Sequence, residues 1–131
     1  MAAVTTYREY KTDLPHVVGG VSTVFWEKLL AANAADSGDT IECFDLPGGA
    51  RITDCSMSVG GTLGAGCTAA LKVGATALTS ATTAGGADTE RMSVHPPAAS
   101  TSSQTVQIAI GGADIAASAA AKVMVQYVMD R

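Results

Sequence analysis

The sequence predicts an all-β fold, a sandwich or a barrel of short strands. Apolar and polar residues alternate with a period of two in four separate runs, the pattern of strands that bury one face. Gly-Gly doublets begin at positions 19, 48, 60, 85 and 111, and most of them separate these runs. About seven short strands with turn signals at such regular spacing are typical of β-sandwiches and barrels.

Composition limits the class of protein further. The chain has 131 residues, 47% of them hydrophobic and 15% charged, with a net charge of −4, and almost half of it is Ala, Gly, Ser or Thr. This predicts one domain with a packed core and argues against a nucleic-acid binder, which normally carries a basic stripe. No apolar run is long enough to span a membrane, and no basic and then apolar leader is visible, so we expect a chain made in the cytoplasm.

The first residues differ from the rest. Residues 1–13 are polar, and residues 25–35 contain good helix formers that could make one or two helical turns. A strand over residues 23–26 is the alternative. We therefore divide the chain into an N-terminal arm, 1–35, extended and partly helical, and a β-sandwich domain, 36–131.

The pattern after residue 39 is that of strands. Residues 40–46 alternate and stop at Pro47-Gly48-Gly49. In residues 51–59 the alternation predicts that Thr53, Cys55, Met57 and Val59 share the buried face. The other predicted strands are 67–73, a weaker one at 75–82, a short one at 90–94, then 104–110 and 121–129.

These alternations predict one apolar core. Its expected members come from four of the runs and are Cys55, Met57, Leu71, Val73, Val106, Ile108, Ile110, Val123 and Val125.

Three cysteines, Cys43, Cys55 and Cys67, lie twelve residues apart. An odd number cannot all pair within one chain. A metal site would need a closely spaced cysteine pair or neighbouring histidines, and His16 and His95 are each isolated. We expect buried free thiols, with no metal and no cofactor.

Motifs for catalysis are weak. Gly61, Gly64 and Gly66 are not spaced as in a dinucleotide-binding loop, and an alternating strand follows them where a helix would be required. The carboxylates form a sequence cluster that is typical of solvated turns, and Asp39 is placed to cap a loop; they are Asp36, Asp39, Glu42, Asp45 and Asp54. We expect no enzymatic activity.

The aromatic residues are concentrated near the N-terminus. Tyr7, Tyr10, Phe25 and Trp26 precede residue 27, and no Phe, Trp or Tyr occurs between Phe44 and Tyr127. Aromatic and arginine side chains dominate interface hot spots. We therefore predict an interface made by Tyr7, Arg8, Tyr10, Phe25 and Trp26. In the alternative, which is compatible with it, these rings complete the domain's own thin core.

The run Gly38-Asp39-Thr40-Ile41, then Leu46 to Asp54 (LPGGARITD), followed by strands rich in Gly, Thr and Ala, resembles small β-sandwich virion proteins of tailed bacteriophages. Capsid decoration (cement) proteins are the nearest class. The resemblance covers residues 36–129 and implies a jelly-roll-like antiparallel sandwich. It also implies a homotrimer on the capsid exterior that contacts the major capsid protein.

The leading functional hypothesis is a non-enzymatic protein that binds and stabilises the phage capsid. One alternative is a tail, baseplate or head-fibre component. Another, of a different class, is a small carbohydrate-binding β-sandwich, which would need exposed rings in the sheet region, where only Phe44 and Tyr127 lie. An enzyme ranks last. Nucleic acid and membrane are not expected partners.

Overall fold

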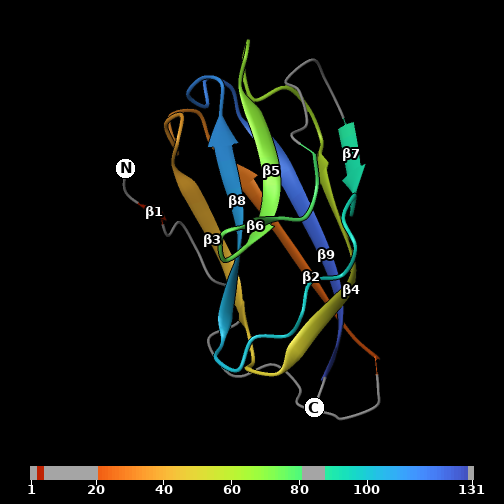
Figure 1. Ribbon diagram of the computed structural model, residues 1–131. Coiled ribbons are helices and arrows are strands. Elements are labelled where there is room, and N and C mark those ends of the chain that lie inside the picture. The colour runs from red at the N-terminus through yellow and green to blue at the C-terminus, as the bar shows by residue number, and fades with distance from the viewer. Residues whose placement is uncertain (1–2, 5–20, 81–87, 130–131) are drawn as a thin grey trace.

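The structure, a computed structural model, describes residues 3–4, 21–80 and 88–129. Two β-sheets pack face to face (Figure 1). One contains β1 (Ala3–Val4), β3 (Thr40–Leu46), β8 (Gln104–Gly111), β5 (Thr68–Val73) and β6 (Thr76–Ala77), in that order. The other contains β2 (Val21–Leu30), β9 (Ala119–Met129), β4 (Ala50–Val59) and β7 (Asp88–Arg91), in that order. No helix occurs within these described residues, so the all-β prediction is confirmed.

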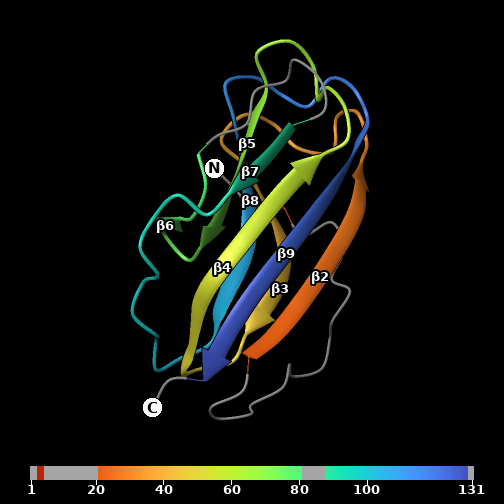
Figure 2. The same cartoon turned by 90° about the vertical axis from the view of Figure 1, so that its right-hand side faces the viewer.

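The strand order is that of a jelly roll. Consecutive strands from β2 to β9 alternate between the two sheets, with the exception of β5 and β6, which pair with each other. All pairs among these eight strands are antiparallel, whereas the two-residue β1 runs parallel to β3. Figure 2 shows the second sheet from its outer side, with β9 between β2 and β4. Eight strands crossing between two sheets in this order confirm the jelly-roll-like sandwich.

The core lies between the sheets and contains the nine residues that the alternation placed there. Each of them has an exposed fraction of 3% or less; they are Cys55, Met57, Leu71, Val73, Val106, Ile108, Ile110, Val123 and Val125. Three rings are buried with them, Trp26 from β2, Phe44 from β3 and Tyr127 from β9. These rings supply the large apolar surface that the Ala- and Val-rich strands lack.

The helical turns expected over residues 25–35 are not formed, and the prediction of a partly helical segment there is wrong. Residues 21–30 are instead one strand that pairs with β9 from Val21 opposite Val128 to Leu30 opposite Ala119. Helix propensity at Glu27, Lys28 and Leu29 amounts to a few tenths of a kcal/mol per residue. Ladder hydrogen bonds and a buried face outweigh it. The described part of the expected arm is thus built into the sandwich.

Two β-bulges shift the alternation. On β4 the register with β9 slips between Ile52 and Asp54, so the intervening Thr53 has no opposite residue and faces solvent. The expectation that Thr53 shares the buried face with Cys55 is therefore wrong, and Ile52 is buried instead. On β3 a similar slip between Glu42 and Phe44 buries two consecutive residues. An extra residue in one strand places the side chains that precede the bulge on the opposite face from the one that strict alternation predicts.

The weak strand expected at 75–82 is shorter than predicted. Only Thr76 and Ala77 are in strand conformation, and residues 81 and 82 lie outside the described ranges. Beyond β6 the chain stays beside β5, because the Leu78 N–H donates to the Leu71 carbonyl at 2.8 Å and the Thr79 hydroxyl accepts from the Leu71 N–H at 3.1 Å. A threonine side chain replaces the backbone acceptor there, which ends the regular ladder.

Candidate interaction surface

The outer face of the four-stranded sheet carries the most distinctive surface of the described residues. Alternation turns every second side chain of β2, β9 and β4 away from the core. On β2 the outward side chains are Val21, Thr23, Phe25, Glu27 and Leu29; on β9 they include Lys122, Met124 and Val128; on β4 they include Asp54, Ser56 and Ser58. The character of this face changes from apolar at β2 to polar at β7.

Three large apolar side chains form a ridge along β2. Val21, Phe25 and Leu29, here called the β2 ridge, have exposed fractions of 63%, 69% and 60%. They lie four residues apart on one face of one strand, with Thr23 and Glu27 between them. The other large hydrophobic residue exposed in the described chain is Val94, on the loop after β7. On the same outer face Val21 lies opposite Val128 and Phe25 opposite Met124, and exposed apolar surface of this kind marks interaction sites.

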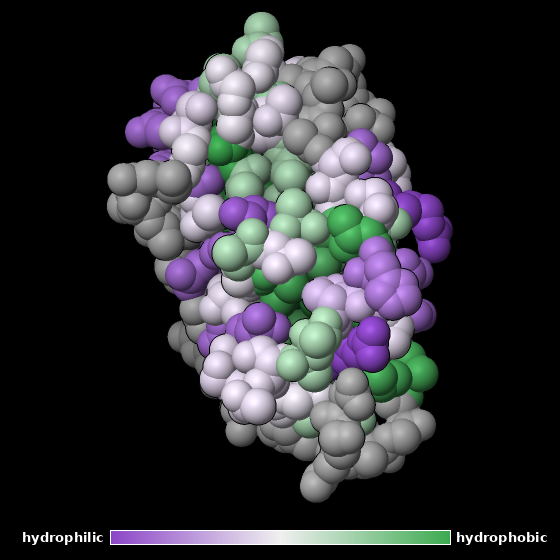
Figure 3. Space-filling model, in the orientation of Figure 1, coloured by the Kyte–Doolittle hydropathy of each residue, from purple (hydrophilic) through white to green (hydrophobic). Residues whose placement is uncertain are grey.

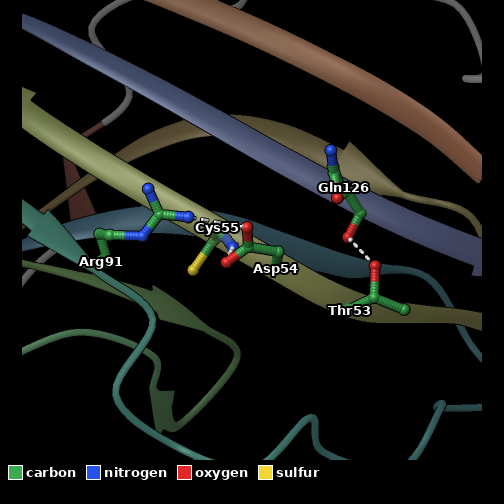
Figure 4. A network of polar contacts seen from close by, with 5 residues as sticks. All are labelled: Thr53, Asp54, Cys55, Arg91 and Gln126. Atoms are coloured by element: carbon green, nitrogen blue, oxygen red, sulfur yellow. Dashed lines mark hydrogen bonds and ion pairs between the residues drawn. The ribbon is translucent and has the colours of Figure 1, made fainter.

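The opposite edge of the same sheet, at β7, is polar, and its side chains pair with those of the neighbouring β4. Arg91 on β7 forms an ion pair with Asp54 on β4 at 3.3 Å, and the Ser58 and Thr89 hydroxyls lie 3.0 Å apart. Figure 4 shows the Arg91 guanidinium directed at Asp54, which also accepts from the Cys55 N–H. An exposed pair of this type contributes little stability. Together with the shortness of β7, it makes this edge a poor template for another strand.

A shallow depression of about 260 Å³ lies between the β2 ridge and β4. Side chains of Phe25, Glu27, Lys122 and Met124 line it, together with two serines of β4. Lys122 and Glu27 are cross-strand partners and form an ion pair at 3.6 Å. Phe25 is opposite Met124 in the same ladder. The depression is therefore apolar where Phe25 and Met124 line it and charged where Glu27 and Lys122 line it.

The five residues predicted for an interface fall in different places. Tyr7, Arg8 and Tyr10 lie outside the described residues. Phe25 belongs to the exposed β2 ridge, whereas Trp26 is 1% exposed and packs in the core. Consecutive residues of a strand point to opposite faces, so one of this pair is available for contact and the other completes the domain's own core. Val21 and Leu29 were missed, although their four-residue spacing from Phe25 carries the signal once β2 is read as a strand.

The carbohydrate-binding alternative needs exposed rings in the sheets, and the exposed ring of the described sheets is Phe25 on β2. Phe44 and Tyr127, the two rings expected in the sheet region, are both fully buried. Burial raises the pKa of the Tyr127 hydroxyl, while its hydrogen bond with the Ser22 side chain acts in the opposite direction. These rings belong to the core.

The outer face of the other sheet offers no comparable ridge. Among the described residues, none of β3, β5, β6 and β8 carries an exposed large hydrophobic side chain. Figure 3 shows this side of the molecule, on which hydrophilic and hydrophobic residues are interspersed. Asp45 on β3 accepts from the Thr105 hydroxyl at 2.8 Å, and Gln107 on β8 donates to the Gly74 carbonyl at 3.0 Å. Before β3, the Asp39 carboxylate accepts from the Asp36 N–H at 3.0 Å, so its expected role in capping a loop is confirmed. These carboxylates have structural partners.

All three cysteines are free and buried. Burial raises the pKa of Cys43 well above its usual range and raises that of Cys55 to about 12, with the neighbouring Asp54 charge as a second cause for Cys55. Burial, and then Asp114, also raises the pKa of Cys67. Within the described ranges no three metal-ligating side chains are grouped.

We expect the native thiols to be almost inert at pH 8, because the thiolate is the reactive form and burial suppresses it. A chromogenic disulfide reagent should react slowly with the folded protein and should find three thiols per chain in urea without reductant. Rapid reaction in the native state would contradict the burial, and fewer than three thiols after unfolding would contradict the absence of disulfides.

With the fold and this surface established, the comparisons with known proteins give a consistent class of neighbour. No protein-family model matches the chain, and no curated protein sequence does. Among solved structures, a chain of the capsid of Ralstonia phage GP4 has a TM-score of 0.64 and 21% identity, over 93% of this chain and 92% of that one. A chain of the cyanophage Pam1 capsid asymmetric unit has a TM-score of 0.59 and 19% identity, over 91% and 93%.

The protein therefore has the fold of chains found in two phage capsids. Coverage above nine-tenths in both directions means that the likeness extends over nearly the whole length of each chain. No helix in the described part of the chain is long and apolar enough to cross a membrane.

Proposed function

We propose that this protein is a non-enzymatic structural component of a tailed-phage virion that binds the outer surface of the capsid and stabilises it. The observation that carries the proposal is the fold, shared over more than nine-tenths of both chains with proteins of two phage capsids. The resemblance of residues 38–54 to decoration proteins supports the same class independently of the fold.

The stabilisation follows from mass action. A protein that binds the assembled shell and not its free subunits lowers the free energy of the shell by RT ln(1 + [L]/Kd). Many copies on one lattice bind with higher effective concentration when each contacts two neighbouring subunits. A small, rigid sandwich suits this task because little conformational entropy is lost when it docks.

The proposed contacts combine described and N-terminal residues. The β2 ridge supplies exposed apolar surface next to the depression, and Tyr7, Arg8 and Tyr10 supply further aromatic and cationic groups before it. The partners are the major capsid protein and further copies of this chain, with a homotrimer as the assembly that the resemblance implies.

Co-sedimentation with phage heads that lack the protein tests this proposal. We expect saturable binding and a higher temperature of head disruption when the protein is bound. Phe25→Ala and the double variant Tyr7→Ala/Tyr10→Ala should each weaken binding about tenfold or more, since central aromatic contacts commonly cost that much.

Val94→Ala is the matched control, because it removes an exposed apolar side chain far from β2 in the sequence and should leave binding unchanged. Binding to tails or baseplates with none to heads would support the alternative virion location instead. Light scattering of the free protein tests the trimer, and an invariant monomer at all concentrations would contradict it.

A further inference from the structure

We propose that β2 is a self-association edge, which pairs antiparallel with β2 of a second copy about a twofold axis through Phe25. The two four-stranded sheets would then continue as one sheet. This contact goes beyond capsid binding, since it joins two copies in solution and needs no shell.

The first support is that β2 is unlike the other sheet-terminal strands. Among the strands of the described residues it is the last on its side of the sheet order. It has ten residues, whereas β1 and β6 have two each and β7 has four. Natural edges are shortened or charged to prevent pairing with other chains. β7 follows that rule through its shortness and through Glu90 and Arg91. β2 carries Glu27 and Lys28, but it is long, and three of the five side chains on its exposed face are apolar.

The second support is the symmetry of the β2 ridge. Val21 and Leu29 lie four residues on either side of Phe25. An antiparallel pair centred on Phe25 places Phe25 opposite its own copy and Val21 opposite Leu29 of the other copy. All three apolar side chains then have apolar partners on one face, at the close spacing of cross-strand neighbours.

The third support is charge. Glu27 and Lys28 are the charged residues of β2. In the register centred on Phe25, Glu27 lies opposite Thr23 and Lys28 opposite Ser22, so no like charges meet. If the twofold axis passed through Val24 or Trp26 instead, the outward side chains of the two copies would still share one face. Phe25 would then lie opposite Thr23 or Glu27, respectively, and would have no apolar partner. A centre on Glu27 itself would oppose two carboxylates. The register centred on Phe25 is the one that keeps the faces matched, opposes no like charges and gives all three apolar side chains of the β2 ridge an apolar partner.

The proposed β2 contact has twofold symmetry, so it does not itself generate a trimer. It can occur in addition to the threefold contacts of a trimer. On a shell it would join copies that belong to neighbouring trimers. Its failure and the failure of capsid binding are distinguishable, because the tests below use the free full-length protein.

Two variants at one position separate this pairing from other modes of association. In the proposed register residue 23 lies opposite Glu27 of the other copy. Thr23→Lys should preserve or strengthen association and Thr23→Glu should weaken it, so that the dissociation constants in sedimentation differ by at least about tenfold at low salt. The difference should shrink in 1 M NaCl, where exposed charges are screened. Equal constants for the two variants would overturn the register.

Disulfide trapping tests the register directly, and the three native thiols are buried and do not compete. With oxidised glutathione, Phe25→Cys should form a covalent dimer. Val21→Cys alone and Leu29→Cys alone should not, whereas a mixture of the two should cross-link. Self-cross-linking of Val21→Cys would indicate a different register. A monomeric wild type together with no cross-link from Phe25→Cys would overturn the proposal.

Discussion

Replacing Trp26 by alanine should lower the free energy of unfolding by about 3–5 kcal/mol, the usual cost of deleting a large buried ring. Trp26 is 1% exposed and is the largest of the fully buried side chains. The core is mostly Val, Ile, Leu and Ala, whose side chains are too short to fill the space that the ring would leave. Since a domain of this size has a total stability of about 5–15 kcal/mol, we expect a substantial fall in the urea midpoint.

Phe25→Ala is the matched control for that experiment. It removes a ring from the adjacent position of the same strand, but the ring is 69% exposed. Its effect on the free energy of unfolding should stay within about 0.5–1 kcal/mol, measured at low protein concentration so that association does not contribute. Similar losses for both variants would show that the two rings do not occupy opposite faces of β2.

A conservative variant separates the packing of Trp26 from its polar group. The Trp26 indole N–H is buried without an acceptor among the described residues. Leaving a donor unsatisfied costs about 1–3 kcal/mol, so its removal offsets part of the lost volume. Trp26→Phe should therefore be much less destabilising than Trp26→Ala, and an equal loss would indicate that the N–H has a partner in the native protein.

Gly112→Ala should destabilise the protein by about 3 kcal/mol, through backbone strain and overlap together. Gly112 follows β8 and has a φ of 75°, in the left-handed region that disfavours a Cβ. An added Cβ would also overlap the carbonyl oxygen of Gly66, in the loop between β4 and β5. The two loops close the same end of the sandwich, and neither backbone can retreat without breaking the Thr68–Gly111 pairing.

Gly60→Ala is the control for Gly112→Ala. Gly60 is exposed, its φ is not positive, and the nearest atom to an added Cβ is the Ala120 carbonyl oxygen at 3.6 Å. Its unfolding midpoint should match that of the wild type. A loss as large as that for Gly112→Ala would contradict the account by strain and overlap, because Gly60 has neither the positive φ nor the close carbonyl oxygen of Gly112. The lower entropy of the unfolded chain would by itself favour Gly60→Ala.

Most of the sandwich could be predicted from local pattern. Residues 40–46 were expected to form a strand and do so with the same bounds, and residues 104–110 differ from β8 by one residue. The nine core residues were identified because a half-buried strand must alternate, whatever its neighbours are. The single Thr53 error arose because a bulge is decided by pairing with β9, which local alternation does not contain.

The candidate surface was harder to predict. Phe25 and Trp26 were chosen together as an anchor, yet one is outside and the other inside, and Val21 and Leu29 were overlooked. The reason is that the concentration of aromatic residues before residue 27 does not say which face each side chain takes. Residues 25–35 also fit one or two helical turns, in which these side chains have different neighbours. Once β9 provides a partner along all ten residues of β2, a period of two replaces a period of 3.6.

The sequence by itself therefore determined the all-β class, the core-facing residues of its alternating runs and the buried state of its thiols, because these depend on the period of polarity along single strands. Tertiary structure decided the conformation of residues 21–30, the two bulges and the exposure of the β2 ridge. Each of these depends on which strand lies alongside, and a ladder with β9 outweighs the small local preferences of Glu27, Lys28 and Leu29.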